Sequence, residues 1–256
     1  MIAPEHSPPQ SDEPAVLLAG VSKRYGRTLA VRDLSLSVRR GELFAFLGPN
    51  GAGKTTTIKL IVGLLQPNEG VIRVCGHPIG SNGLAAKAQL AYVPDQPFLY
   101  EKLTGREFLY FVGEMFGMTT TRRDVVLASL IRRLDLDEFL DRATEGYSHG
   151  MKQKIVLAAA LMHDPAVLVI DEPMVGLDPK SVRTVRNLFI EHTRAGGTVF
   201  MSTHTLDIAE ALADRIGIIH RGSLIAVGTL AELRAQARRQ HSLEEIFLQL
   251  TEADDD

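Results

Sequence analysis

The stretch GPNGAGKTT, residues 48–56, constrains the fold of this chain more than any other. It follows an apolar run, LFAFL, and precedes a run with helical spacing that extends to about Leu65. Its glycines allow turns in which several backbone N–H groups point at one anion. A helix that begins beside them adds unpaired N–H groups and its positive end. A strand, a glycine loop and a helix in this order predict a phosphate-binding loop, and hence a protein that binds a nucleoside triphosphate.

Two side chains of this loop have roles that follow from their chemistry. Lys54 provides a full positive charge for the β- and γ-phosphates, and Thr55 provides a hydroxyl for Mg²⁺. The segment GKTTTIKLIVGLL is predicted to form the helix that follows, ending near the Gln66-Pro67-Asn68 turn because proline cannot continue it.

A second acidic element for magnesium lies in VLVIDEP. Residues 167–170 form a continuous apolar run, as expected for a strand buried on both faces of a parallel sheet. Asp171 ends this strand, which places its carboxylate near the phosphate loop. Glu172 follows and is suited to orient and partly deprotonate an attacking water. The alternative is a pair of loop carboxylates that only contact solvent.

Composition restricts the kinds of partner. The chain has 256 residues, 45% of them hydrophobic and 23% charged, which is typical of a soluble globular protein. Its net charge is −3 without a basic cluster, so a nucleic-acid partner has little electrostatic support. A single cysteine, Cys75, excludes an internal disulfide. The longest apolar run, residues 155–162, is too short to span a membrane, and the N-terminal stretch has no apolar signal segment. We therefore expect membrane association only through a partner.

The segments of the chain differ in pattern. Residues 1–14 are rich in proline and serine and are predicted to be a disordered tail. Short strands with period-two alternation follow, and from residue 94 the spacing becomes helical, with a capping box predicted at Thr104 and Glu107. After residue 165, strands and helices alternate again, and Asp178 followed by Pro179 predicts a helix start. The end, EADDD, is an acidic tail over residues 252–256.

A further segment, YSHGM at residues 147–151, precedes a predicted helix. Together with Lys54 and with Asp171 after a helical insert, it makes the chain resemble the ATPase domain of an ATP-binding cassette (ABC) transporter over roughly residues 17–251. The resemblance implies an α/β fold, namely a P-loop NTPase (RecA-like) core with an N-terminal antiparallel β subdomain and an inserted α-helical subdomain. The implied single ABC ATPase domain covers residues 15–251. Its parts are a core of residues 15–93 and 166–228, a helical subdomain of residues 94–165, and C-terminal helices of residues 229–251.

The resemblance also implies roles for individual residues. Tyr25 would stack its ring on adenine; the alternative is an exposed aromatic residue at a strand end. Residues 176–178, GLD, match the segment that crosses the dimer interface, and His204 matches the histidine that senses the γ-phosphate, although a lone histidine can also be structural. The implied catalytic residues are Lys54, Glu172 and His204. The implied ATP contacts are Tyr25, Gly48, Pro49, Asn50, Gly51, Ala52, Gly53, Lys54, Thr55, Thr56, Ser148 and Gly150. The implied magnesium ligands are Thr55 and Asp171, with Asp95 and Gln96 as further candidates.

Two segments depart from the family pattern. The signature segment, LSGGQ in the family, is YSHGM here, with Ser148 and Gly150 retaining the hydroxyl and the close-approach backbone, and His149 replacing a glycine. In YVPDQPFLY, Asp95 stands where the family usually has glutamine, and Gln96 follows. Asp95 is implied to couple magnesium and water to a membrane subunit; the alternative is a surface turn residue. An acidic residue here, together with the ending SLEEIFLQLTE, resembles the drug and antibiotic exporter branch.

These features predict the motor subunit of an ABC transporter. Two copies would pack head to tail and enclose ATP and Mg²⁺, a separate transmembrane permease would contact residues 95–100, and the chain would be cytoplasmic, on the inner face of the membrane. A rival hypothesis is a soluble ABC-type ATPase that acts on ribosomes or nucleic acid, but such proteins usually carry two cassettes, a coiled-coil insert or basic tracts. A P-loop kinase or GTPase would leave the Asp171–Glu172 pair, the Ser148 segment and His204 unexplained.

Overall fold

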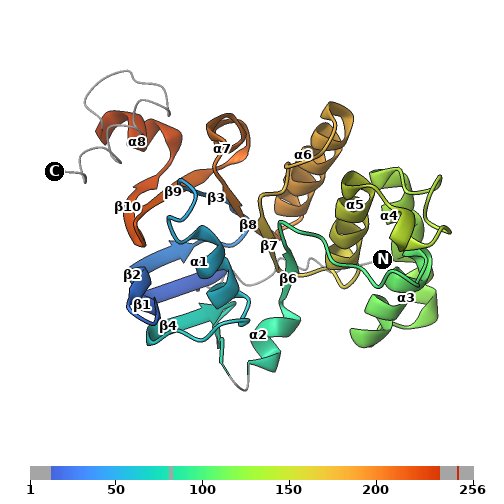
Figure 1. Cartoon of the computed structure of the whole chain (residues 1–256), viewed down its shortest axis with the longest axis horizontal. Coiled ribbons are helices and arrows are strands. Elements are labelled where there is room, and N and C mark those ends of the chain that lie inside the picture. The colour runs from blue at the N-terminus through green and yellow to red at the C-terminus, as the bar shows by residue number, and fades with distance from the viewer. Residues whose placement is uncertain (1–12, 81–82, 237–246, 248–256) are drawn as a thin grey trace, which may run out of the picture.

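The structure is a computed structural model that describes residues 13–80, 83–236 and 247. Its strands form two sheets (Figure 1). The first is antiparallel in the order β2-β1-β4-β5, with β1 Val16–Tyr25, β2 Thr28–Val38, β4 Glu69–Val74 and β5 His77–Pro78. The second has the order β10-β9-β3-β8-β7-β6, with β3 Leu43–Leu47, β6 Leu90–Val93, β7 Val167–Asp171, β8 Thr198–Thr203, β9 Arg215–His220 and β10 Ser223–Gly228.

Strands β9, β3, β8, β7 and β6 run parallel, and only the edge strand β10 is antiparallel to its neighbour. Every residue of β3, β7 and β8 is buried. This burial on both faces explains the apolar runs LFAFL of β3 and VLVI of β7 in the sequence. Because parallel strands end at the same edge, the segments after β3, β7 and β8 lie together there.

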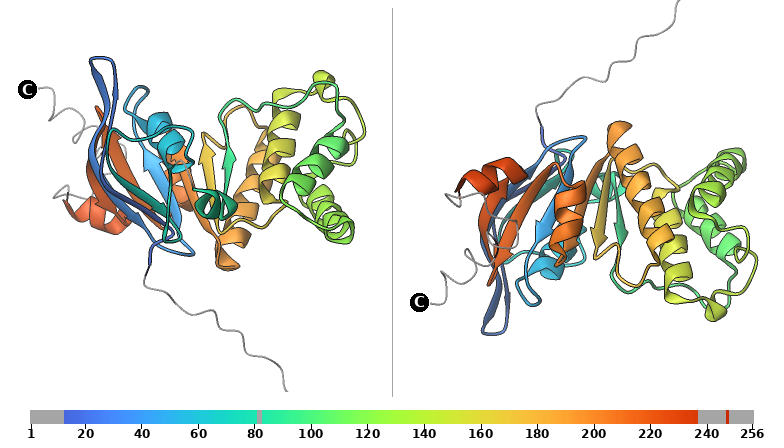
Figure 2. Two further views of the ribbon diagram at one scale, coloured as in Figure 1. Left: turned by 90° about the horizontal axis from the view of Figure 1, so that it is seen from below. Right: turned by 90° about the horizontal axis from the view of Figure 1, so that it is seen from above.

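The helices surround this sheet unevenly. Figures 1 and 2 show the antiparallel sheet at one end of the long axis, α3, α4 and α5 at the other end, and the six-stranded sheet between them. The helix bounds are α1 Lys54–Ile61, α2 Leu84–Ala88, α3 Gly105–Met115, α4 Thr120–Leu134, α5 His149–Leu161, α6 Pro179–Arg194, α7 Leu206–Leu212 and α8 Leu230–Gln236, with a 3₁₀ turn over Thr144–Gly146. No helix within the described ranges is long and apolar enough to cross a bilayer.

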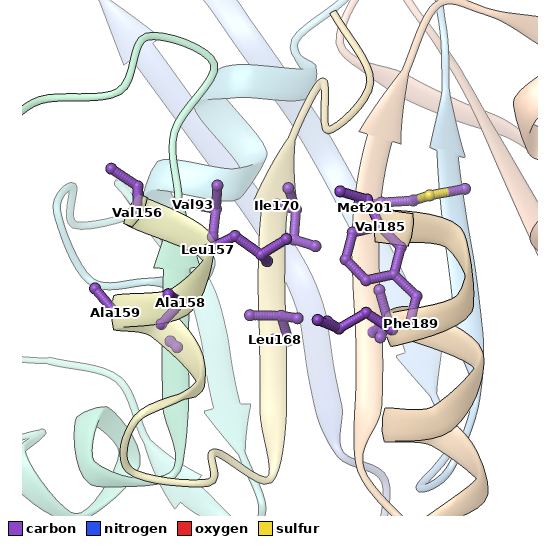
Figure 3. Close-up of a cluster of buried hydrophobic side chains, with 14 of the residues drawn as sticks. Val93, Val156, Leu157, Ala158, Ala159, Leu168, Ile170, Val185, Phe189 and Met201 are labelled. Carbon is purple, nitrogen blue, oxygen red and sulfur yellow. The ribbon is translucent and has the colours of Figure 1, made fainter. Parts of the chain in front are cut away.

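A shared apolar cluster joins α5 and α6 to the sheet (Figure 3). Leu157 points from α5 toward Ile170 of β7, and Phe189 points from α6 toward the same strand and β8. These three side chains are almost completely buried. Burial of apolar surface stabilises a core by about 25 cal/mol for each Å² removed from water. The cluster therefore fixes the position of α5, whose N-terminal end carries Ser148, relative to the strand that ends in Asp171.

Both predicted helix starts are present. The Thr104 hydroxyl accepts the Glu107 N–H, and the Glu107 carboxylate accepts the Thr104 N–H at 2.8 Å, which is a complete capping box. Asp178 caps α6 by accepting the N–H groups of Lys180 and Ser181, each at 3.0 Å.

The predicted end of the first helix was wrong. Helix α1 stops at Ile61 rather than near Leu65, because Gly63 adopts a left-handed conformation (φ 72°) that ends the helix one turn before Pro67 is reached. Two short elements, β5 and α2, were also not predicted. The predicted tail of residues 252–256, and residues 1–12 of the predicted tail of residues 1–14, lie outside the described residues. The division of residues 15–251 into core, helical subdomain and C-terminal helices stays a prediction.

Candidate nucleotide-binding site

The phosphate loop joins β3 to α1 and lies close to two neighbouring strands. A side chain on Gly53, where φ is 109°, would place its Cβ 2.6 Å from the Ala30 carbonyl oxygen. A Cβ on Gly48 would lie 2.5 Å from the Ile219 carbonyl oxygen. Both distances are shorter than any normal contact, so the loop can approach β2 and β9 this closely only with glycine at these positions.

Lys54, the first residue of α1, is held inside this loop. Its side chain is only 7% exposed, and its Nζ donates to the carbonyl oxygens of Gly48 at 2.7 Å and Pro49 at 3.3 Å. Nζ also lies 3.8 Å from Glu172 Oε1. Burial lowers the pKa of Lys54, while the charges of Glu172 and Asp171 oppose that change. The loop thus positions a cation where it faces the pocket acids and can meet a phosphate group.

One pocket gathers residues from four parts of the chain. Its lining consists of Ala30, Pro49, Asn50, Gly51, Gly53, Lys54, Thr55, Thr56, Asp95, Asp171 and Glu172. Among the further magnesium candidates, the structure places Asp95 in this lining, whereas Gln96 is exposed and does not line it. Gly48 supports Lys54 through its carbonyl oxygen, and Ala52 is buried behind the loop.

The two acids stand at the end of β7 in different environments. Asp171 is 2% exposed, and its carboxylate accepts the Ser202 hydroxyl at 2.5 Å. Glu172 has φ 50°, a left-handed conformation that costs about 1–3 kcal/mol for a residue with a side chain. Its N–H is directed at both the carbonyl oxygen and the hydroxyl oxygen of Ser202, each at 3.3 Å. Ser202 is therefore a residue of the site that sequence reasoning missed, although its hydroxyl is a polar group within the buried strand TVFMST.

The Glu172 carboxylate faces two groups that were predicted to act on the γ-phosphate. His204 Nδ1 lies 2.8 Å from Glu172 Oε1, the same oxygen that faces Lys54 Nζ. Since an ionised carboxylate only accepts, the imidazole N–H donates in this contact. The His204 side chain is about half exposed, so its other ring nitrogen can meet a ligand that enters the pocket. Lys54 and Glu172 line the pocket, and His204, which does not line it, joins them through its contact with Glu172.

Tyr92 on β6 is a second residue that sequence reasoning missed. Burial, followed by the negative charges of Asp171 and Asp95, raises the pKa of Tyr92 to about 12. Its phenol therefore stays neutral beside the two carboxylates at ordinary pH. The sequence signal was only an aromatic residue in a short strand, which is equally typical of a core residue.

The described residues fit a magnesium ion held together with a nucleotide. They contain no cluster of three histidine, cysteine, aspartate or glutamate side chains that would bind a metal alone. They do place the Thr55 hydroxyl and the buried Asp171 carboxylate in one pocket with the phosphate loop. Mg²⁺ commonly uses one or two carboxylates together with substrate phosphates, which is the donor set available here.

The remaining predicted contacts lie elsewhere. Ser148 caps α5, accepting the Met151 N–H at 3.3 Å, and neither it nor Gly150 lines the pocket. The His149 ring lies against Gly176, where a Cβ would come 2.7 Å from His149 Cδ2. The signature segment therefore packs on the loop predicted to cross a dimer interface. Tyr25 is exposed at the end of β1 and also does not line the pocket.

A phosphate loop at a strand–helix junction, with two acids at the end of another parallel strand of the same sheet, defines a P-loop ATPase. Comparison with known proteins narrows this class to one family. The sequence profile of the family described as "ABC transporter" matches residues 31–175, more than half of the chain.

Individual relatives agree with that match. The chain is 40% identical over 213 residues to the linearmycin resistance ATP-binding protein LnrL of Bacillus subtilis, covering 83% of this chain and 68% of LnrL. It is 41% identical over 212 residues to the Nod factor export ATP-binding protein I of Burkholderia orbicola, covering 81% and 68%. Among solved structures, an ATP-binding subunit of an ABC transporter superposes with a TM-score of 0.88 at 34% identity, covering 92% of this chain and 99% of that one.

The chain belongs to the ABC transporter family, as an ATP-binding protein. The predicted fold class is thereby confirmed, as are the predicted ATPase activity and the use of ATP and Mg²⁺. The relatives favour the transporter interpretation over an ATPase that acts on ribosomes or nucleic acid.

Proposed function

We propose that this chain is the motor subunit of an exporter, and that two copies close head to tail on ATP. One observation carries the proposal. Lys54, Asp171 and Glu172 line one pocket and His204 contacts Glu172, whereas Ser148, at the N-terminal end of α5, does not line the pocket. A hydroxyl and backbone N–H groups at a helix N-terminus are suited to bind phosphate. Two-fold packing would bring this end of each copy to the pocket of the other.

Each pocket residue has a distinct proposed role. Lys54 binds the β- and γ-phosphates, exchanging its contacts with the Gly48 and Pro49 carbonyl oxygens for phosphate oxygens. Thr55 and Asp171 hold Mg²⁺, which neutralises charge on the phosphates. Glu172 orients the attacking water and accepts its proton, and His204 holds the Glu172 carboxylate and reaches the γ-phosphate. Loss of the γ-phosphate removes the contacts that hold the two copies together.

A surface for the membrane subunit lies next to this pocket. Residues 95–100 begin at the pocket with Asp95 and lead to Phe98, which is 75% exposed. The Tyr100 ring packs edge-on against Phe98 and Phe111, with centroids 6.0 and 5.8 Å apart. Exposed aromatic rings that gather in one patch are typical of an interaction site. We assign this surface to an apolar segment of a separate permease, which would place the chain on the cytoplasmic face of the membrane.

The direction of transport rests on the relatives. The names of the two relatives above state resistance to linearmycin and export of Nod factor, and each covers more than four fifths of this chain. Asp95 after the YVP segment and the ending SLEEIFLQLTE are the features of this sequence that resemble exporters. Export is therefore the transport direction proposed here.

The test of the motor is Glu172→Gln. Without its base, the pocket still binds ATP, but turnover falls by about 10²-fold or more. The variant is expected to accumulate as a nucleotide-bound dimer, seen by size-exclusion chromatography with light scattering in ATP and Mg²⁺, and to stay monomeric in ADP. Normal turnover by this variant would remove Glu172 from its role. Co-purification with a polytopic membrane protein supports the motor, whereas RNase-sensitive sedimentation with ribosomes supports the rival.

A further inference from the structure

Ser202 on β8 touches both acids of the site, and no role has yet been assigned to it. The strands β7 and β8 are parallel neighbours, and Ser202 is the partner of Asp171 in their register. The Ser202 side chain is fully buried. Its hydroxyl donates to Asp171 Oδ1 and lies 3.3 Å from the Glu172 N–H, which also approaches the Ser202 carbonyl oxygen. A single residue thus meets the two carboxylate-bearing residues that follow one another on the neighbouring strand.

These contacts bear on the orientation of the Asp171 carboxylate and on the backbone conformation of Glu172. A buried carboxylate on a freely rotating side chain needs a donor to hold one oxygen in place. The Ser202 hydroxyl is such a donor to Asp171, and it leaves the second carboxylate oxygen for a metal. Glu172 has a left-handed backbone (φ 50°), which persists only where the surroundings hold it. Its N–H contacts to Ser202 supply part of that restraint.

We propose that Ser202 is a positioning residue for ATP hydrolysis: it orients the Asp171 carboxylate for Mg²⁺ and holds Glu172 in the left-handed conformation that directs its carboxylate at Lys54 and His204. The inference rests on the roles proposed above for Asp171 and Glu172. Ser202 touches neither nucleotide nor metal in this account, and it acts through the two acids.

The direct test removes the hydroxyl. Groups that orient a metal ligand typically change metal affinity or activity by about 10- to 100-fold when lost. For Ser202→Ala we expect kcat to fall by about that factor with little change in KM. We also expect the Mg²⁺ concentration that half-saturates binding of a fluorescent ADP analogue to rise by about 10-fold. This second readout needs no turnover. Ser202→Thr retains a hydroxyl and is expected to keep kcat and the half-saturating Mg²⁺ concentration near their wild-type values.

A matched control is available on the same strand. Thr198 is also buried on β8, and its hydroxyl contacts the Gly41 N–H at 3.0 Å and the Arg39 carbonyl oxygen at 3.4 Å, away from the acids. Thr198→Val removes a buried hydroxyl of the same strand and is expected to lower Tm without changing kcat or the Mg²⁺ requirement. A merely structural role for Ser202 would give Ser202→Ala this same result.

The possible outcomes distinguish failure of the proposed role of Ser202 from failure of the proposed magnesium site. If Ser202→Ala keeps the wild-type kcat and Mg²⁺ requirement, or if Ser202→Thr folds with the wild-type Tm and behaves like Ser202→Ala, the inference is wrong. If the added methyl group lowers the Tm of Ser202→Thr, the Ser202→Ala comparison with Thr198→Val decides alone. Asp171→Asn must raise the Mg²⁺ requirement. An unchanged requirement there would instead overturn the proposed magnesium site.

Discussion

The nucleotide pocket and the N-terminal end of α5 are both suited to bind phosphate, but they are built in different ways. In the pocket, the charged side chains are Lys54 from one segment and the consecutive Asp171 and Glu172 from another, and each already has a partner within the chain. At the end of α5, the groups proposed to bind phosphate are a cap hydroxyl on Ser148 and backbone N–H groups, with the His149 ring against the 176–178 loop. In the proposed scheme, the pocket is one half of the site, and the α5 end adds binding groups without catalytic side chains.

This difference shows how one chain can couple chemistry to assembly. A pocket that held all its groups in one copy would hydrolyse ATP whether or not a second copy arrived. Because the α5 end lies outside the pocket, tight binding of ATP and closure of two copies become one event in the proposed scheme. Variants that affect the two regions separately therefore test whether the pocket and the α5 end have different roles.

The largest effect is expected for Lys54→Ala. This change removes the buried cation of the pocket and leaves Glu172 without one of its two partners. Loss of a group that stabilises transition-state charge typically lowers kcat by about 10²–10³-fold. ATP binding to the single copy is also expected to weaken, as measured by titration with a fluorescent analogue. Unchanged binding and turnover would show that the loop lysine does not contact the phosphates.

A smaller effect with a different signature is expected for Ser148→Ala. Turnover should fall by about 10-fold or more as one charge-assisted hydrogen bond is lost, which is worth about 1.5–3 kcal/mol. Affinity of the single copy for ADP should stay at the wild-type value, because Ser148 does not line its pocket. A fall in that affinity would place Ser148 in the same pocket as Lys54 and contradict its proposed role in the pocket of the second copy.

Ser148 is also a helix cap, so its loss requires a control. Thr119 caps α4 in the same helical region by accepting the Arg122 N–H at 3.3 Å. Removing either cap is expected to cost about 1 kcal/mol of unfolding free energy. Thr119→Ala should therefore match Ser148→Ala in Tm and match the wild type in turnover. Equal turnover losses in both variants would reduce Ser148 to a structural cap.

The smallest effect concerns the other end of α5. His163 follows this helix, its ring is stacked on Phe116 at 3.7 Å, and its buried Nδ1 has no hydrogen-bond partner among the described residues. Burial lowers the pKa of His163 below its ordinary value near 6.5, with the Leu90 carbonyl oxygen and Asp164 opposing the change. Below pH 6.5 the unfolded chain thus binds more protons than the folded chain, and stability is lost as pH falls toward the folded pKa.

The variant His163→Phe removes this titration and keeps a ring for stacking. We expect its stability to depend less on pH than that of the wild type between pH 6.5 and 5, by up to about 1.4 kcal/mol per pH unit. Thermal unfolding of both proteins across this range measures the difference. Parallel pH profiles would show that His163 titrates alike in the folded and unfolded chain.

Much of this account could be predicted from sequence because its signals are local. The glycine spacing of the phosphate loop, the buried strand before Asp171 and the caps at Thr104 and Asp178 each depend on a few consecutive residues. The same reasoning misplaced the end of α1, because it gave weight to Pro67 and not to the left-handed Gly63.

The features of the site that could not be predicted from sequence depend on which strands become neighbours. Nothing in the segment TVFMST says that Ser202 stands beside Asp171, since this follows from the pairing of β7 with β8. The left-handed conformation of Glu172 and the placement of Asp95, rather than Gln96, in the pocket are likewise set by three-dimensional contacts. Short elements without periodicity, such as α2, leave too little pattern to predict.

The most direct test of the shared pocket mixes two variants that are each impaired in turnover. If each pocket takes Lys54 from one copy and Ser148 from the other, a heterodimer of Lys54→Ala and Ser148→Ala has one intact pocket. Random pairing in an equimolar mixture then restores roughly a quarter of wild-type ATPase activity. A mixture of Lys54→Ala with Glu172→Gln, which affects the same half of the pocket, restores none. Activity no higher than that of the separate variants in the first mixture, or equal recovery in both, would contradict a pocket shared between two copies.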